Sequence, residues 1–150
     1  MATAARLTID ADLARLAEVR RFVRETAPGL GADETMVAEL VQAVDEWVTN
    51  VIVHGYRGGS GPIEVELERS RFEIEVRIRD AAPAFDPDTA PAFDKSLPLE
   101  RRPAGKMGIH LIRELSDRFE RRDPDGAEGG NVVTICKDCP PVASHTGGTA

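Results

Sequence analysis

The chain has 150 residues, of which 41% are hydrophobic and 30% are charged, which is the composition of an ordinary globular domain. Its 19 basic and 26 acidic side chains give a formal net charge of −7, which argues against a nucleic-acid-binding protein because such proteins need a basic surface. No apolar run approaches the roughly 18 residues of a membrane span, and the first residues are too mixed for a secretory signal. We therefore expect a soluble, cytoplasmic protein.

Apolar residues recur at helical spacing in two stretches of the first third of the chain. An acidic residue stands before each stretch, where its side chain can accept hydrogen bonds from the first turn of a helix. Further along, apolar and charged residues alternate as in strands with one buried face. The predicted elements are a strand at Arg6–Ile9, a helix from Asp10 or Asp12 to Thr26, a helix from Asp33 to His54, strands at Ile63–Leu67 and Phe72–Arg79, a helix at Met107–Ser116, and strands around Phe119 and at Asn131–Cys136.

The two strands on either side of Ser70 form a predicted hairpin with one apolar and one charged face. A sheet of this kind is covered on one side only, which favours an antiparallel sheet under helices over a parallel, doubly covered one. The segment from Asp80 to Gly105 follows none of these patterns and carries five prolines. A loop of that length in a small domain is uncommon and is usually functional or disordered.

Polar residues interrupt the apolar second half of the long predicted helix. Glu46 and Asn50 are four residues apart, and His54 follows four residues later, so the three share one face of a regular helix. A carboxylate and an amide one turn apart can hold a metal ion through oxygen while the carboxylate orients a nucleophile. Polar pairs at this spacing are also common on solvated helix faces, and the spacing alone leaves both interpretations open.

Two further features flank the long loop. Asp80 stands directly after a predicted strand, where carboxylates contact ligands or simply begin turns. At the other end, Gly105 and Gly108, which are three residues apart, lead into an amphipathic helix. Glycines allow backbone amides to approach phosphates, and a helix N-terminus offers unpaired N–H groups, although glycines are also ordinary loop residues.

The order of these features resembles the GHKL (Bergerat-fold) ATP-binding domain, and most of all the stand-alone serine kinase/anti-sigma factors of the RsbW and SpoIIAB type. The resemblance covers residues 5–138. The matching segments are Glu39–Tyr56 with the N-box helix, Ile78–Pro87 with the adenine motif, Gly105–Asp117 with the second glycine motif and its helix, and Gly130–Ile135 with the last strand.

The resemblance implies a fold and a set of roles. The fold is a two-layer α/β sandwich, in which a mixed, mostly antiparallel sheet is covered on one face by three helices. Asn50 would hold the Mg²⁺ that bridges the phosphates, and Glu46 would be the catalytic carboxylate. Asp80 would accept a hydrogen bond from the adenine amino group, Thr134 would support that contact, and Ala82 would lie near the ring.

The second glycine motif would bind the phosphates of ATP. The residues concerned are Gly105, Lys106, Met107 and Gly108, while Arg101 and Arg102 lie in the long loop, where a cation could reach the terminal phosphate. The adenine motif departs from the family pattern Asp-x-Gly-x-Gly, because Ala82 replaces its first glycine. We expect this added methyl group to reduce nucleotide affinity.

These roles imply an ATP-dependent serine-protein kinase that phosphorylates a STAS-type antagonist protein, sequesters a sigma factor and forms a homodimer. The expected domain covers residues 1–139, and a flexible C-terminal tail covers residues 140–150.

The alternative is a binding module with the same fold that holds a partner with little or no kinase activity. A detached histidine-kinase catalytic domain is disfavoured, because the chain has no phospho-accepting histidine helix of its own. We expect no direct contact with nucleic acid or membrane.

Overall fold

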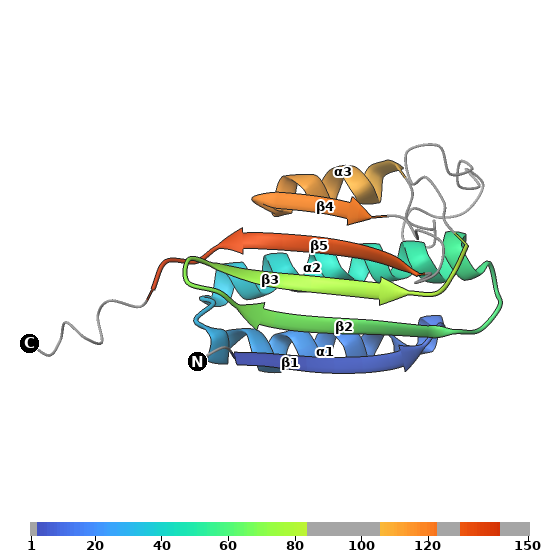
Figure 1. Ribbon diagram of the computed structural model, residues 1–150, viewed down its shortest axis with the longest axis horizontal. Helices are drawn as coiled ribbons and strands as arrows, with labels where there is room; N and C mark the ends of the chain where they lie inside the picture. Colours follow the sequence, from blue (N-terminus) through green and yellow to red (C-terminus); the bar gives the residue numbers. More distant parts are fainter. Residues whose placement is uncertain (1–2, 84–105, 123–129, 142–150) are drawn as a thin grey trace, which may run out of the picture.

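The computed structural model describes residues 3–83, 106–122 and 130–141, which form one sheet and three principal helices (Figure 1). Short 3₁₀ segments precede and follow the first helix. The principal elements are β1 (Thr3–Asp10), α1 (Leu16–Thr26), α2 (Glu34–Asn50), β2 (Pro62–Arg69), β3 (Glu73–Asp80), α3 (Lys106–Leu115), β4 (Arg118–Arg122) and β5 (Asn131–Asp138).

The sheet has the strand order β1-β2-β3-β5-β4, and every strand pair in the described residues is antiparallel. The helices pack α1 on α2 and α2 on α3, and they lie together behind the sheet in Figure 1. This arrangement confirms the predicted two-layer sandwich with helices on one face. The sheet is more uniform than predicted, since none of its described pairs is parallel.

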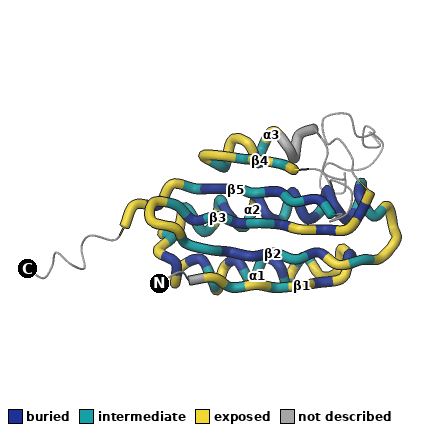
Figure 2. Tube along the Cα trace, viewed as in Figure 1, coloured by how far each residue is buried: buried dark blue, intermediate teal, exposed yellow. Residues whose placement is uncertain are grey.

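Alternation along the central strands separates the two faces of the sheet. In β3, Ile74, Val76 and Ile78 are fully buried beneath the helices, whereas the residues between them point to the other face. Buried residues therefore follow α2 and the central strands in Figure 2. The core also contains Trp47, which is 1% exposed and meets Phe119 of β4 edge to face, with 6.0 Å between ring centroids.

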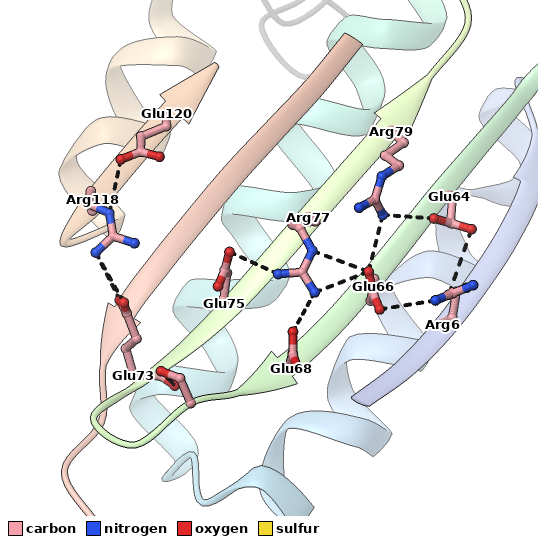
Figure 3. Close-up of polar contacts among 11 residues, drawn as sticks. Arg6, Glu64, Glu66, Glu68, Glu73, Glu75, Arg77, Arg79, Arg118 and Glu120 are labelled. Carbon is pink, nitrogen blue, oxygen red and sulfur yellow. Dashed lines mark hydrogen bonds and ion pairs between the residues drawn. The ribbon is translucent and has the colours of Figure 1, made fainter. Parts of the chain in front are cut away.

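The outer face of the sheet is a network of ion pairs rather than a second core (Figure 3). Glu66 lies at its centre, with Arg6, Arg77 and Arg79 each 3.2 or 3.3 Å from its carboxylate oxygens. Glu64, Glu68 and Glu75 complete this network, and Arg118 forms a second group with Glu73 and Glu120 on the same face. Opposite charges on neighbouring strands stabilise this face without covering it.

The helix boundaries follow their caps. Asp12 accepts a hydrogen bond from Ala14 N at the first 3₁₀ turn, and Asp33 accepts one from Met36 N at the start of α2. The predicted end of the long helix at His54 is wrong in detail. The α-helix ends at Asn50 and continues as a π-helical segment, Val51–Tyr56. Hydrogen bonds there join residues five apart instead of four, so His54 does not keep the angular position of Glu46 and Asn50.

Some predictions receive corrections or fall outside the described residues. Phe72 was expected on the apolar face of a strand, but it lies in the turn before β3, is 59% exposed, and has the Arg71 guanidinium over its ring. The loop at 84–105 and residues 142–150 of the predicted tail lie outside the described residues. No helix in the described ranges is long and apolar enough to span a membrane.

Candidate functional site

The last turns of α2 bring the first two candidate residues together. Glu46 is half-buried, and Asn50, one turn later, has no exposed surface. Neither Oδ1 nor Nδ2 of Asn50 has a hydrogen-bond partner among the described residues. A buried amide with both polar atoms unpaired is unfavourable in an isolated fold, so it points to a ligand that supplies the missing bonds.

Glu46 and its neighbour Asp45 have different environments. Burial, and to a lesser extent the charge of Asp45, raise the pKa of Glu46 above its ordinary value of 4.5. Asp45 instead points toward α1, where its Oδ1 lies 2.8 Å from Nη1 of Arg20. A carboxylate with a raised pKa is a better proton acceptor, which suits Glu46 to a role as general base.

Asp80 ends β3 on the helix-covered side of the sheet and is 6% exposed. Its Oδ1 accepts hydrogen bonds from Ala82 N at 2.9 Å and from Nδ2 of Asn131 at 2.7 Å. No described residue donates to Oδ2, which leaves one carboxylate oxygen for a ligand. Burial raises the pKa of Asp80, although the hydrogen bonds from Asn131 and Ala82 and the charge of Arg121 oppose that rise.

Two residues that support Asp80 were not predicted from the sequence. Asn131, at the start of β5, donates from Nδ2 to Asp80 and also to the carbonyl of Ala82 at 3.0 Å. It therefore holds both ends of the short turn from Asp80 to Ala82. Gly130 has a φ of 85°, and a Cβ there would lie 2.9 Å from the carbonyl oxygen of Asp80. Asn131 stands opposite Asp80 in the β3–β5 register, and Gly130 precedes it, so their roles could have been deduced only if that pairing had been known.

The structure does not bring Thr134 to Asp80. In β5 the core-facing residues are Asn131, Val133 and Ile135, so Thr134 faces the opposite side of the sheet. There it pairs in register with Arg77 and Glu120. The prediction that Thr134 supports Asp80 is therefore wrong, and Asn131 makes that contact.

The second glycine motif is only partly described. The helix α3 begins at Lys106, one residue before the predicted start, so Lys106, Met107 and Gly108 form its first turn. Nζ of Lys137 fixes the other end of α3 by donating to the carbonyl of Leu115 at 2.7 Å. Gly105, Arg101 and Arg102 lie outside the described residues, so their predicted contacts with phosphate stay predictions.

The described residues suit a Mg²⁺–nucleotide complex. The amide oxygen of Asn50 is of the oxygen type that Mg²⁺ prefers, it is buried, and it lacks a partner. The free oxygen of Asp80 can accept a hydrogen bond from an amino group. The C-terminal ends of α2 and β3, which carry these residues, lie at the same end of the molecule in Figure 1.

This two-layer sandwich, with buried polar residues where a helix and a strand end, agrees with the GHKL class of nucleotide-binding domains that the sequence resembles. The model of the histidine kinase-like ATPase domain matches residues 9–137. Serine-protein kinase RsbW of Halalkalibacterium halodurans is 30% identical over 125 residues, covering 80% of this chain and 76% of the relative. RsbW of Bacillus cereus strain AH820 is 23% identical over 124 residues, covering 80% and 78%. The chain therefore belongs to the histidine kinase-like ATPase family, in its RsbW-type group.

A solved structure has the same fold. It contains the RsbU and RsbW domains of Rv1364c from Mycobacterium tuberculosis, and it superposes with a TM-score of 0.63 at 22% identity. The alignment covers 92% of this chain but only 33% of that longer chain. At this identity the likeness establishes the architecture, and it agrees with the antiparallel sheet and helices described above.

Proposed function

We propose that this protein is an ATP-dependent serine-protein kinase and anti-sigma factor, which phosphorylates a STAS-type antagonist and sequesters a sigma factor. The buried, unpaired amide of Asn50, one helical turn from Glu46, carries the proposal. A module that only binds proteins has no need of this pair. The kinase names of the similar RsbW proteins support the same conclusion.

Each described residue has a distinct task in this proposal. Asn50 would hold Mg²⁺, which neutralises phosphate charge when bound. Glu46 would accept the proton of the attacking serine hydroxyl, and the rise in its pKa by burial makes it a stronger base for that task. Asp80 would accept from the adenine amino group, while Asn131 holds the Asp80 side chain in place. Phosphoryl transfer depends chiefly on positioning and charge stabilisation, so few side chains are needed.

The remaining roles rest on the family resemblance. The backbone around Gly105 and Gly108, with Lys106, Met107 and one of Arg101 and Arg102, would bind the phosphates. We expect a homodimer in the cytoplasm that contacts neither nucleic acid nor membrane. Ala82 is buried, and its backbone N and O are both hydrogen-bonded to the Asp80–Asn131 pair, so its extra methyl group does not prevent this turn from forming.

The test is transfer of labelled phosphate from ATP to a STAS-type protein from the same organism, with sigma-factor capture measured in parallel. Glu46→Ala should reduce transfer by about 10²- to 10⁴-fold while sigma-factor capture persists. Asp45→Ala is the matched control, because it removes a neighbouring carboxylate that faces Arg20, and transfer should continue. A wild-type protein that captures the sigma factor but transfers no phosphate would establish the binding-module alternative instead.

A further inference from the structure

Tyr56 connects the two parts of the candidate site. It is the last residue of the π-helical segment that follows Asn50, and its hydroxyl accepts a hydrogen bond from Ala81 N at 2.9 Å. The same hydroxyl donates to the carbonyl of Pro62 at 2.8 Å, at the first residue of β2. One side chain thus joins the end of the α2 segment to the residue directly after Asp80.

The surroundings of Tyr56 are shaped to hold its ring. A Cβ on Gly61 would lie 2.3 Å from Cε1 of the ring, so only glycine permits this close packing. Gly61 is itself fixed, because its N–H donates to Oδ1 of Asp10 at 3.0 Å and its carbonyl accepts from Ala11 N at 2.8 Å. Burial, followed by the charges of Asp80 and Asp10, raises the pKa of Tyr56, although its bond with Ala81 opposes the rise. The hydroxyl therefore keeps the proton that it donates to Pro62.

The segment that presents Tyr56 is itself unusual. Six consecutive residues, Val51–Tyr56, are π-helical, whereas π-helix in proteins is mostly confined to single turns that are frequently found at functional sites. The segment ends at Arg57 with a φ of 53°, a left-handed conformation that is uncommon for a residue other than glycine. This geometry places the hydroxyl at Ala81, where it fixes the backbone beside Asp80.

We infer that Tyr56 is a positioning residue for adenine recognition, which holds the Ala81 backbone so that the free oxygen of Asp80 faces the adenine amino group. The inference rests on the proposed function, because it requires Asp80 to contact adenine. Asn131 fixes the side chain of Asp80 through its other oxygen, and Tyr56 fixes the main chain that follows. Two independent restraints on one carboxylate are expected where a single hydrogen bond must select the base.

The experiment compares the affinities for ADP and IDP, because inosine lacks the amino group that Asp80 would recognise. Tyr56→Phe keeps the ring over Gly61 and removes only the hydroxyl. It should weaken ADP binding by about 3- to 10-fold, the effect of one hydrogen bond, and leave IDP binding unchanged. Ser70→Ala is the matched control, since it removes a hydroxyl that donates to Glu73 O in the β2–β3 turn, at the opposite end of these strands. It should alter neither affinity.

The outcomes separate this inference from the proposed function. If the wild-type protein binds ADP no more tightly than IDP, the contact between Asp80 and adenine is wrong, and the inference fails with it. If the wild type prefers ADP but Tyr56→Phe loses both nucleotides equally, or neither, Tyr56 does not position Asp80. Tyr56 is the only tyrosine in the chain, so incorporation of 3-fluorotyrosine changes this side chain alone. The fluorine makes the hydroxyl a weaker hydrogen-bond acceptor, while the aromatic ring stays in place. The labelled protein should also lose part of its preference for ADP, and an unchanged preference would overturn the inference.

Discussion

Asn50, Asp80 and Asn131 are three of the four buried polar or charged side chains in the described ranges 3–83, 106–122 and 130–141. The fourth, Glu66, is fully engaged with arginines on the outer face. By contrast, Asn50 has two unpaired polar atoms and Asn131 has one, its Oδ1. Buried polar groups are nearly always paired. This contrast therefore indicates a ligand-binding site on the helix-covered side of the sheet, where β3 ends and β5 begins.

Asp80→Asn should weaken ADP binding without unfolding the protein. The Oδ1 of the asparagine can still accept from Asn131 and Ala82, while its amide group replaces the free carboxylate oxygen with a donor. A donor facing the adenine amino group removes one hydrogen bond and adds a repulsive contact, so we expect a loss of about 10- to 100-fold in affinity. Calorimetric titration with ADP measures the loss. Equal affinities for wild type and variant would remove Asp80 from the binding site.

Glu46→Gln should stabilise the protein at neutral pH even as it strongly reduces phosphate transfer. Because burial raises the pKa of Glu46, the folded state binds more protons than the unfolded state between pH 4.5 and the raised value. Wild-type stability therefore falls as the pH rises through that window, and glutamine removes this loss. Urea unfolding at pH 4 and pH 7 measures how the free energy of unfolding of wild type and variant changes with pH, and Asp45→Asn is the control. That control loses the ion pair with Arg20, so its stability should fall.

At the scale of elements, the two faces of β2 and β3 stabilise the fold in different ways. The inner residues are buried under α1 and α2, whereas the outer residues depend on charges from neighbouring strands (Figure 3). Burial alone would raise the pKa of Glu66, but hydrogen bonds and charges from Arg79, Arg77 and Arg6 together outweigh burial and lower it. The outer network therefore stabilises the charged form of Glu66 and, with it, the register of β1, β2 and β3.

Glu66→Gln should destabilise the fold by about 1 to 3 kcal/mol at pH 7, because it removes charge-assisted hydrogen bonds in a side chain that is 10% exposed. A lowered carboxyl pKa contributes stability above the ordinary value of 4.5, and this contribution is lost as the pH falls through the lowered value. The difference from wild type should therefore shrink below pH 4.5. Glu120→Gln is the control, since its carboxylate is 63% exposed and its loss should change little. Denaturant unfolding at several pH values provides the measurement, and a difference that grows in acid would contradict this assignment.

At the scale of the whole molecule, local patterns predicted the architecture, and tertiary pairing decided the details that they missed. The alternation in β2 and β3 and the caps at Asp12 and Asp33 depend on nearby residues, and their predictions are confirmed. The support of Asp80 depends on which residue of β5 stands opposite it, and this register is not visible in one sequence. Thr134 lies in the segment that resembles the last strand of the family, but its side chain faces the outer side of the sheet, away from Asp80. Similarly, hydrophobic spacing does not distinguish four-residue from five-residue hydrogen bonding after Asn50.

A ligand that binds only the native state should raise the melting temperature. The dependence of that rise on Mg²⁺ tests whether Asn50 holds the ion. At a concentration 100 times the dissociation constant, a ligand adds about 2.7 kcal/mol, which corresponds to about 5 to 10 °C for a domain of this size. We expect such a rise for wild type with ADP and Mg²⁺, and a smaller rise when EDTA replaces Mg²⁺. In Asn50→Ala the two rises should be equal, because the amide oxygen proposed to hold the ion is gone.

Thr49→Ala is the matched control for Asn50→Ala, because it removes a neighbouring polar group whose bond is internal to α2. Its hydroxyl donates to the carbonyl of Asp45 at 2.7 Å, so the variant should keep the dependence on Mg²⁺. Without ligand, Asn50→Ala should melt close to wild type, since it removes an amide whose polar atoms are unpaired in the described structure. An Asn50→Ala protein that still gains extra stability from Mg²⁺ would show that another residue holds the ion. The unpaired amide would then need a different ligand.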